Sequence, residues 1–258
     1  MENNESLSEY LDDVYMDCME TLKEDIKEFT MVKKVIALEQ SNEILGKIEL
    51  FYKHNLVEGR KCFYKASLAR EWFYIEFPKK EHDIESYYIS SFAYESLYNA
   101  ILSADKGQAI RMAQLYGSIE VKDVEEFLPT MLLGYGLKYI ILDDKVNAME
   151  YIRKIDDNKS KRGMKQYSEG HARAYEGIIE RDETEFNKGL EYMLKHHVAR
   201  MRRNGKYLEE FFAYDSVALA MLARDRGIAI TVKHNLLPID FLKDTDIDYA
   251  ELRLFDSE

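Results

Sequence analysis

Residues that interrupt helices or cross-link chains are scarce in this sequence. Three of its 258 residues are proline and twelve are glycine, so few positions break a helix. Its two cysteines, Cys18 and Cys62, are too few for the disulfide framework of a small secreted protein. A single disulfide between them is left open, with nothing in the sequence to support it.

Long apolar runs are also missing. None approaches the roughly 20 residues that a membrane-spanning helix needs. The first ten residues, MENNESLSEY, are polar and acidic, unlike a secretory leader. We therefore expect a cytoplasmic protein with reduced thiols and no membrane association.

Negative charge is concentrated at the two ends of the chain. The net charge is −12, of which residues 1–28 carry −8 and residues 239–258 carry −5, leaving +1 for residues 29–238. Without a basic surface, nucleic-acid binding is disfavoured. A basic protein partner would be attracted to the acidic ends, although such ends can equally serve solubility alone.

Apolar residues make up 46% of the chain, and they recur every three or four positions along most of it. This spacing predicts an all-α protein of about ten helices. A short β-prone segment follows near 228–233. The expected helices cover residues 6–29, 31–54, 60–77, 84–104, 106–116, 121–142, 145–155, 159–182, 183–203 and 207–226.

A weak repeat runs through the middle of the chain. Residues 101–109 match residues 140–148 at an offset of 39 positions, and residues 178–183 continue the pattern. Each unit has a long apolar helix, an aspartate at the turn and a shorter helix, and the aspartate can cap the second helix. The period is similar to that of tetratricopeptide arrays, without their consensus residues.

We therefore predict stacked antiparallel helical hairpins in one domain, residues 1–258. Within it, residues 1–105 form N-terminal helices and residues 106–238 form the hairpin-repeat part. Residues 239–258 form an acidic tail.

Histidines are the first candidates for chemistry. His196 and His197 are adjacent, so they point about 100° apart on a helix and cannot easily bind one metal. One of them is expected to be half-buried and the other exposed. His171 lies on an apolar stripe and is expected to be a core residue with one hydrogen bond.

Asp215 and the basic run at 200–206 are the other candidates. Asp215 is either a buried carboxylate that needs a partner or, as we favour, the cap of a new helix at Asp215 or Ser216. The basic run, RMRRNGK, is typical of a solvated helix end. In helical register, the histidines, the basic run and Asp215 are not expected to converge.

The sequence GYG at 134–136 resembles a phosphate loop only superficially. It lies inside an apolar helix and lacks the lysine and further glycines of such loops. We interpret it as a close helix–helix contact. No triad, metal cluster or nucleotide-binding loop is assembled, so we predict that the protein is not an enzyme and needs no cofactor or metal.

The apolar helix SVALAMLAR at 216–224 is followed by DRGI at 225–228 and LLP at 236–238. Together with EFNKGLEYMLKHH at 185–197, this region resembles the bacterial immunity protein 49 family, which is found beside polymorphic toxins. The resemblance implies an antitoxin-like protein that binds a cognate toxin in the cytoplasm and blocks it by occlusion. A basic nuclease is one toxin that the acidic ends would suit.

The resemblance supplies no contact residues, so the partner-binding prediction rests on acidic positions near turns. The alternative function is a helical-repeat adaptor or regulator that binds a peptide or protein, and a homodimer is left open. The predicted partner-binding residues are Glu125, Glu126, Asp143, Asp144, Glu209, Glu210 and Asp215.

Overall fold

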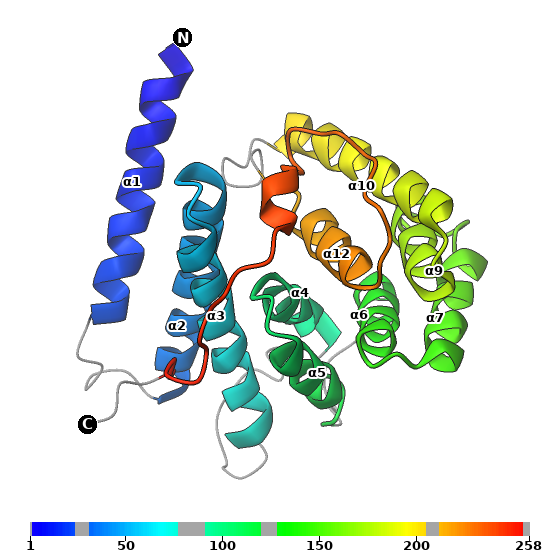
Figure 1. Cartoon of the computed structure of the whole chain (residues 1–258), viewed down its shortest axis with the longest axis horizontal. Helices are drawn as coiled ribbons and strands as arrows, with labels where there is room; N and C mark the ends of the chain where they lie inside the picture. The colour runs from blue at the N-terminus through cyan, green and yellow to red at the C-terminus, as the bar shows by residue number, and fades with distance from the viewer. Residues whose placement is uncertain (1, 24–30, 77–90, 120–127, 205–211, 255–258) are drawn as a thin grey trace.

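The computed structural model describes residues 2–23, 31–76, 91–119, 128–204 and 212–254, and these residues form an all-α fold (Figure 1). The predicted fold class is confirmed. Parts of five expected helices, at 24–29, 77, 84–90, 121–127 and 207–211, lie outside the described residues. The α-helices are α1 (Glu2–Lys23), α2 (Met31–Lys47), α3 (Leu56–Glu76), α4 (Glu95–Leu102), α5 (Lys106–Leu115), α6 (Leu128–Ile141), α7 (Lys145–Asp157), α8 (Lys165–Tyr167), α9 (Arg173–Glu180), α10 (Glu183–Asn204) and α12 (Tyr214–Asp225).

Short pieces of other helical types join these elements. The turns η2 (Ile48–Tyr52) and η6 (Ser168–Ala172) are π-helical, whereas η5 (Ser91–Tyr94) and η7 (Ile239–Leu242) are 3₁₀-helical. The β-prone segment at 228–233 is an irregular loop, and an isolated bridge between His234 and Leu237 follows it.

Three helix pairs reverse direction through the same kind of turn. Ala104, Asp143 and Arg181 adopt left-handed φ angles of 64°, 58° and 55°. The next residue in each case is an aspartate. Asp105, Asp144 and Asp182 accept hydrogen bonds from the backbone N–H groups of Gln108, Asn147 and Glu185 at 2.6, 3.1 and 3.0 Å. The predicted caps are confirmed, and each turn folds the second helix back onto the first.

Ion pairs place these turns along one edge of the array. Lys145 bridges from the second turn to Glu180 beside the third at 2.6 Å. The C-terminal end of α12 lies at the same edge as these turns. Arg226 contacts Asp143 of the second turn at 3.0 Å, and Asp225 contacts Lys106 beside the first turn at 3.3 Å. We call residues 104–106, 143–146 and 180–182 the turn edge.

The centre of the molecule is occupied by α12, which Figure 1 shows between α4, α6 and α10. Residues 216–221 of this helix are all buried, as expected of a helix that is apolar on nearly every face. One hydrophobic cluster runs from Val35 to Leu242. Gly134 serves a close contact, as predicted, because a Cβ atom there would lie 2.1 Å from the hydroxyl of Tyr116.

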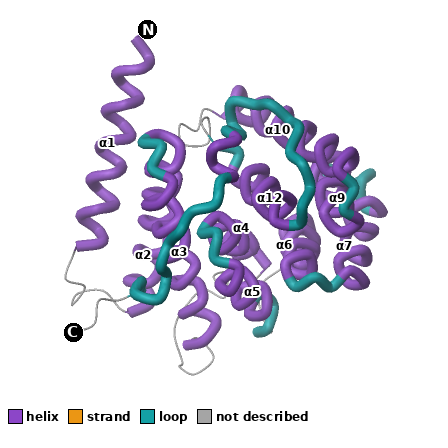
Figure 2. The backbone as a smooth tube through the Cα atoms, viewed as in Figure 1, coloured by secondary structure: helices purple, strands orange, loops and turns teal. Residues whose placement is uncertain are grey.

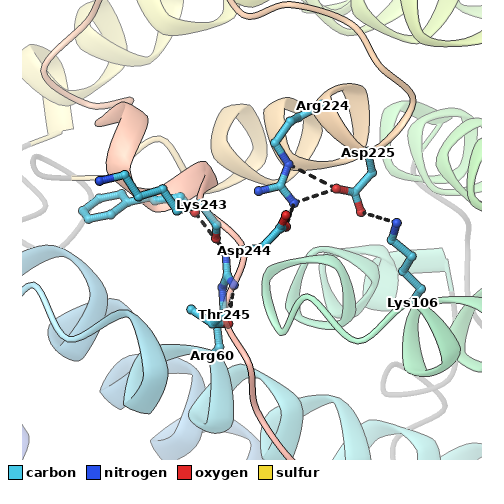
Figure 3. A network of polar contacts seen from close by, with 8 residues as sticks. Arg60, Lys106, Arg224, Asp225, Lys243, Asp244 and Thr245 are labelled. Atoms are coloured by element: carbon cyan, nitrogen blue, oxygen red, sulfur yellow. Dashed lines mark hydrogen bonds and ion pairs between the residues drawn. The ribbon is translucent and has the colours of Figure 1, made fainter.

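A buried arginine holds the chain after α12 against the N-terminal helices. Figure 2 shows this chain passing α10 as a loop and then crossing α3. Arg60 is 1% exposed. It donates hydrogen bonds to the carbonyl oxygens of Phe241, at 3.3 Å, and Lys243, and to the hydroxyl of Thr245 (Figure 3). The described part of the acidic tail is therefore docked.

Both cysteines are free thiols, so the Cys18–Cys62 disulfide that the sequence left open is not formed. Burial raises the pKa of both thiols, and that of Cys62 reaches about 12. Within the described ranges, no helix combines the length and apolar character of a membrane span.

Replacing Arg60 with methionine should reduce the free energy of unfolding by about 2–4 kcal/mol. The carbonyl groups of the tail would stay near α3 without their buried donor. Urea denaturation would measure this loss, and trypsin should cleave the tail faster. The control Arg153→Met, at an exposed position of α7, should cost under about 0.5 kcal/mol. Equal stability of the two variants would contradict the clamp.

Asp105→Ala should lower the free energy of unfolding by about 1 kcal/mol, because the first turn of α5 loses its cap. Asp105→Asn should keep most of that stability, since asparagine caps a helix as well as aspartate. Urea denaturation of the two variants compares them directly. A loss of similar size in both would show that charge, not capping, is what matters at this position.

Candidate functional site

A partly open cavity of about 130 Å³ lies where α10, η6, α4 and the start of α12 meet. Polar and aromatic side chains from distant parts of the sequence converge on it. Its lining residues are Lys47, Tyr94, Glu95, Tyr98, Gln166, Tyr167, His171, Met193, His196, His197, Arg200, Phe212, Tyr214 and Asp215.

A histidine–aspartate pair lies in this lining. The Nε2 atom of His171 is 3.1 Å from Oδ2 of Asp215. The other carboxylate oxygen of Asp215 accepts from the backbone N–H of Ser216 at 2.7 Å and from the Ser216 hydroxyl at 3.2 Å. His171 is 7% exposed, and its Nδ1 atom is buried with no hydrogen-bond partner among the described residues.

The surroundings of Asp215 keep its carboxylate ionised. Burial alone would raise the pKa of this group. The hydrogen bond from His171, the charges of His171 and His197 and the backbone N–H of Ser216 outweigh burial and hold the pKa well below its ordinary value. The cavity therefore contains a fixed carboxylate that orients one imidazole.

Two local features bring the histidines together. His171 lies in the π-helical turn η6, where one extra residue per turn shifts the side-chain register, and such turns are frequent at functional sites. Gly189 lets α10 approach this region closely, because a Cβ atom there would lie 2.5 Å from the backbone nitrogen of Ala174. His197 and Arg200 follow on α10, about two and three turns later.

Tyrosines form much of the remaining wall. Burial raises the pKa of Tyr94, Tyr98 and Tyr214 well above the ordinary value, so their hydroxyl groups stay protonated at neutral pH. The Tyr214 hydroxyl donates to the backbone oxygen of Glu95 at 3.1 Å and to the side chain of Asn99. The ammonium group of Lys47 lies 4.6 Å from the centroid of the Tyr214 ring.

The prediction that these candidates do not converge is wrong. His171, His196, His197, Arg200 and Asp215 all line the same cavity. Of the rest of the basic run, Met201 does not line the cavity, and the side chains of residues 202–206 lie outside the described ones. Helical register orders residues within one helix but does not say which distant helices meet.

The expectations for single residues had mixed outcomes. A new helix does begin near Asp215, but its capping position is Ala213, without a side-chain cap. Asp215 instead takes the alternative role of a carboxylate with a partner. His197 is buried and His196 is half-buried rather than exposed. His171 is a buried residue with one hydrogen bond, as predicted.

Of the other predicted partner-binding residues, Asp143 and Asp144 lie on the turn edge and do not line the cavity beside Asp215. The side chain of Asp143 is 85% exposed on the turn edge, and Asp144 is engaged as the cap of α7. Their role in partner binding stays a prediction. Glu125, Glu126, Glu209 and Glu210 lie outside the described residues.

A larger groove follows another face of α10. It measures about 880 Å³ and lies between α10 and residues 231–234 of the loop after α12. Asn187 fixes its far wall, since its amide donates to the carbonyl of Ala229 at 2.9 Å and accepts from the N–H of Thr231 at 2.8 Å. Along α10, the groove is lined by Glu183, Thr184, Asn187, Lys188, Glu191, Leu194, Lys195, Val198 and Ala199.

Chemically, the cavity suits recognition of a small polar group. None of its described lining residues is serine, threonine or cysteine, the side chains that most often act as nucleophiles. Across the described chain, no group of three or more His, Cys, Asp or Glu residues is placed to hold a metal ion. The groove is large enough for a segment of another protein.

Asp215→Asn should flatten the acid dependence of stability. The folded pKa of Asp215 is depressed, so its ionised form stabilises the fold above the unfolded pKa of about 3.9. That contribution is lost as the pH falls below this value toward the folded pKa.

Wild-type stability should therefore fall more steeply than that of Asp215→Asn between about pH 5 and pH 2. At pH 7 the substitution should cost about 1–3 kcal/mol, because the buried His171 loses a charged acceptor. Urea denaturation at a series of pH values measures both effects. The exposed control Asp157→Asn should keep the wild-type slope, and parallel curves for Asp215→Asn would contradict the pairing.

No curated protein and no solved structure matches this chain. A family model does match, and it covers α7 to α12, most of the cavity lining and the whole groove. Residues 141–241 match the model of immunity protein 49, which confirms the family that residues 185–238 resemble.

Proposed function

We propose that this protein neutralises a cognate toxin by binding it in a stoichiometric complex that occludes the toxin's working surface. The match of residues 141–241 to immunity protein 49 carries the proposal, since it supports an immunity function. The proposed action takes place in the cytoplasm of the toxin-producing cell. It requires contact surface and no catalysis.

The groove along α10 is the proposed main contact. It lies wholly within the matched residues, and its stretch from Glu183 to Ala199 spans about 24 Å of helix. An extended segment of about seven residues has that length. Its lining alternates lysines and glutamates over an apolar floor at Leu194 and Val198, a mixture that suits a protein segment.

The turn edge is the proposed second contact. Asp143 is 85% exposed, and next to it Val146 is 80% exposed. A partner could bury this valine and pair with the carboxylate together. The acidic ends of the chain favour a basic toxin, such as a nuclease, because opposite net charge accelerates association.

Co-expression with the toxin-like product of the neighbouring reading frame should restore growth of cells that the toxin alone kills. The purified proteins should form one defined complex, whose stoichiometry light scattering after size-exclusion chromatography would give. Failure to restore growth at equal expression would overturn the proposal. Binding of a different protein segment in the groove would then favour an adaptor.

Two variants locate the contact. Glu191→Trp places a bulky ring in the middle of the groove and should raise the Kd for the toxin at least about tenfold, or 1.4 kcal/mol. The matched control Glu150→Trp, exposed on α7 away from the groove, should bind normally. Asp143→Asn removes one exposed charge from the turn edge and keeps a residue that tolerates left-handed φ. Calorimetry that finds Glu191→Trp equal to its control would exclude the groove.

A further inference from the structure

Hydrogen-bond donors outnumber acceptors in the lining of the cavity between η6, α10 and α12. Its cationic or protonatable side chains are Lys47, His171, His196, His197 and Arg200, and its acids are Glu95 and Asp215. A site of this composition favours a ligand that brings acceptors and negative charge.

Neither acid cancels that preference. Both oxygens of Asp215 already accept hydrogen bonds, from His171 and from Ser216. Glu95 is exposed at the rim rather than enclosed. Lys47 is paired with Glu43 at 2.6 Å, so its charge is partly compensated.

His171 supplies the most direct indication of a ligand. Its Nε2 atom is fixed by Asp215, while its Nδ1 atom is buried without a hydrogen-bond partner in the described part of the chain. A buried polar atom of this kind costs free energy unless something pairs with it. Arg200 lines the same cavity, and its five N–H donors form a planar fork that matches a carboxylate or a phosphate.

Size limits what can enter. The cavity measures about 130 Å³, close to the roughly 150 Å³ that hold one benzene molecule and well below the roughly 300 Å³ at which drug-sized pockets begin. A nucleotide is too large, whereas one carboxylate or phosphate group fits.

We propose that this cavity binds a single oxyanion group, a carboxylate or a phosphate, between the imidazolium form of His171, in which both ring nitrogens donate, and the guanidinium of Arg200. The group has two conceivable sources, a free small anion or an acidic side chain of the bound toxin. The second source rests on the proposed function, and the first does not.

The first experiment uses the protein alone, with inorganic phosphate and acetate as probes at constant ionic strength in sodium chloride. Either anion should raise Tm saturably, by roughly 3 °C at ten times its Kd. Arg200→Gln and His171→Gln should each weaken this binding at least about tenfold, and Arg153→Gln on α7 should not. Because Arg200 is exposed, its variant should remain folded even where His171→Gln does not.

An equal effect of the anions on wild type, Arg200→Gln and Arg153→Gln would overturn the proposal, since phosphate stabilises many proteins by exclusion from their surface. So would the absence of any saturable effect. Nitrogen NMR of His171 adds a direct readout, because the Nδ1 signal should move with phosphate in wild type and stay fixed in Arg200→Gln.

The second experiment identifies the source once anion binding is established. If an acidic toxin side chain fills the cavity, phosphate should weaken toxin binding, and Arg200→Gln should remove that competition. If the natural ligand is a free anion, toxin affinity should be independent of phosphate. Because the first experiment contains no toxin, its result is separate from success or failure of the immunity function.

Discussion

The arrangement of this molecule depends on a turn in which a left-handed residue precedes a capping aspartate. Left-handed φ costs a non-glycine residue roughly 1–2 kcal/mol, and the chain adopts it at Ala104, Asp143 and Arg181. The following aspartate offsets part of that cost by satisfying a free N–H group. The benefit is a reversal so short that successive helices must pack antiparallel. Because the turns share one edge, they fix where α10 and α12 lie, and with them the cavity and the groove.

Closure of the array needs a second, non-local interaction. The loop after α12 could leave the body of the protein, since it contains no regular strand in its described length. Asn187 on α10 holds the loop close to this helix. Its side-chain amide bonds the backbone carbonyl of Ala229 and the backbone N–H of Thr231, the two kinds of group that a neighbouring strand would bond. Arg60 then ties residues 241–245 to α3. These two polar side chains act together with apolar packing of the loop itself, since Ile228, Leu236 and Phe241 are buried in the core cluster. The groove beside α10 stays open.

The sequence predicts the parts of this fold that depend on local chemistry. Apolar spacing locates the helices, and the repeated aspartates identify all three caps, because both signals act within a few residues. The apolar run at 216–224 correctly predicts a helix, α12. The cavity depends on long-range and irregular features. The π-helical register of η6 leaves no sign in an apolar pattern, and the approach of α10 at Gly189 is set by two helices that must already be packed. For the same reason, nothing near Arg60 indicates that its partners lie some 180 residues away.

Helix α10 explains how one element serves both proposed sites. Lys188, Glu191, Lys195 and Val198 are spaced by three or four residues and line the groove. Met193, His197 and Arg200 form a second stripe with the same spacing and line the cavity. Lys195 and His197 are about 200° apart on the helix, so the stripes occupy opposite faces. A partner in the groove and an anion in the cavity would therefore contact the same helix without competing for space. Any coupling between them must pass through movement of α10 itself, since free energy is coupled only through a state that both ligands change.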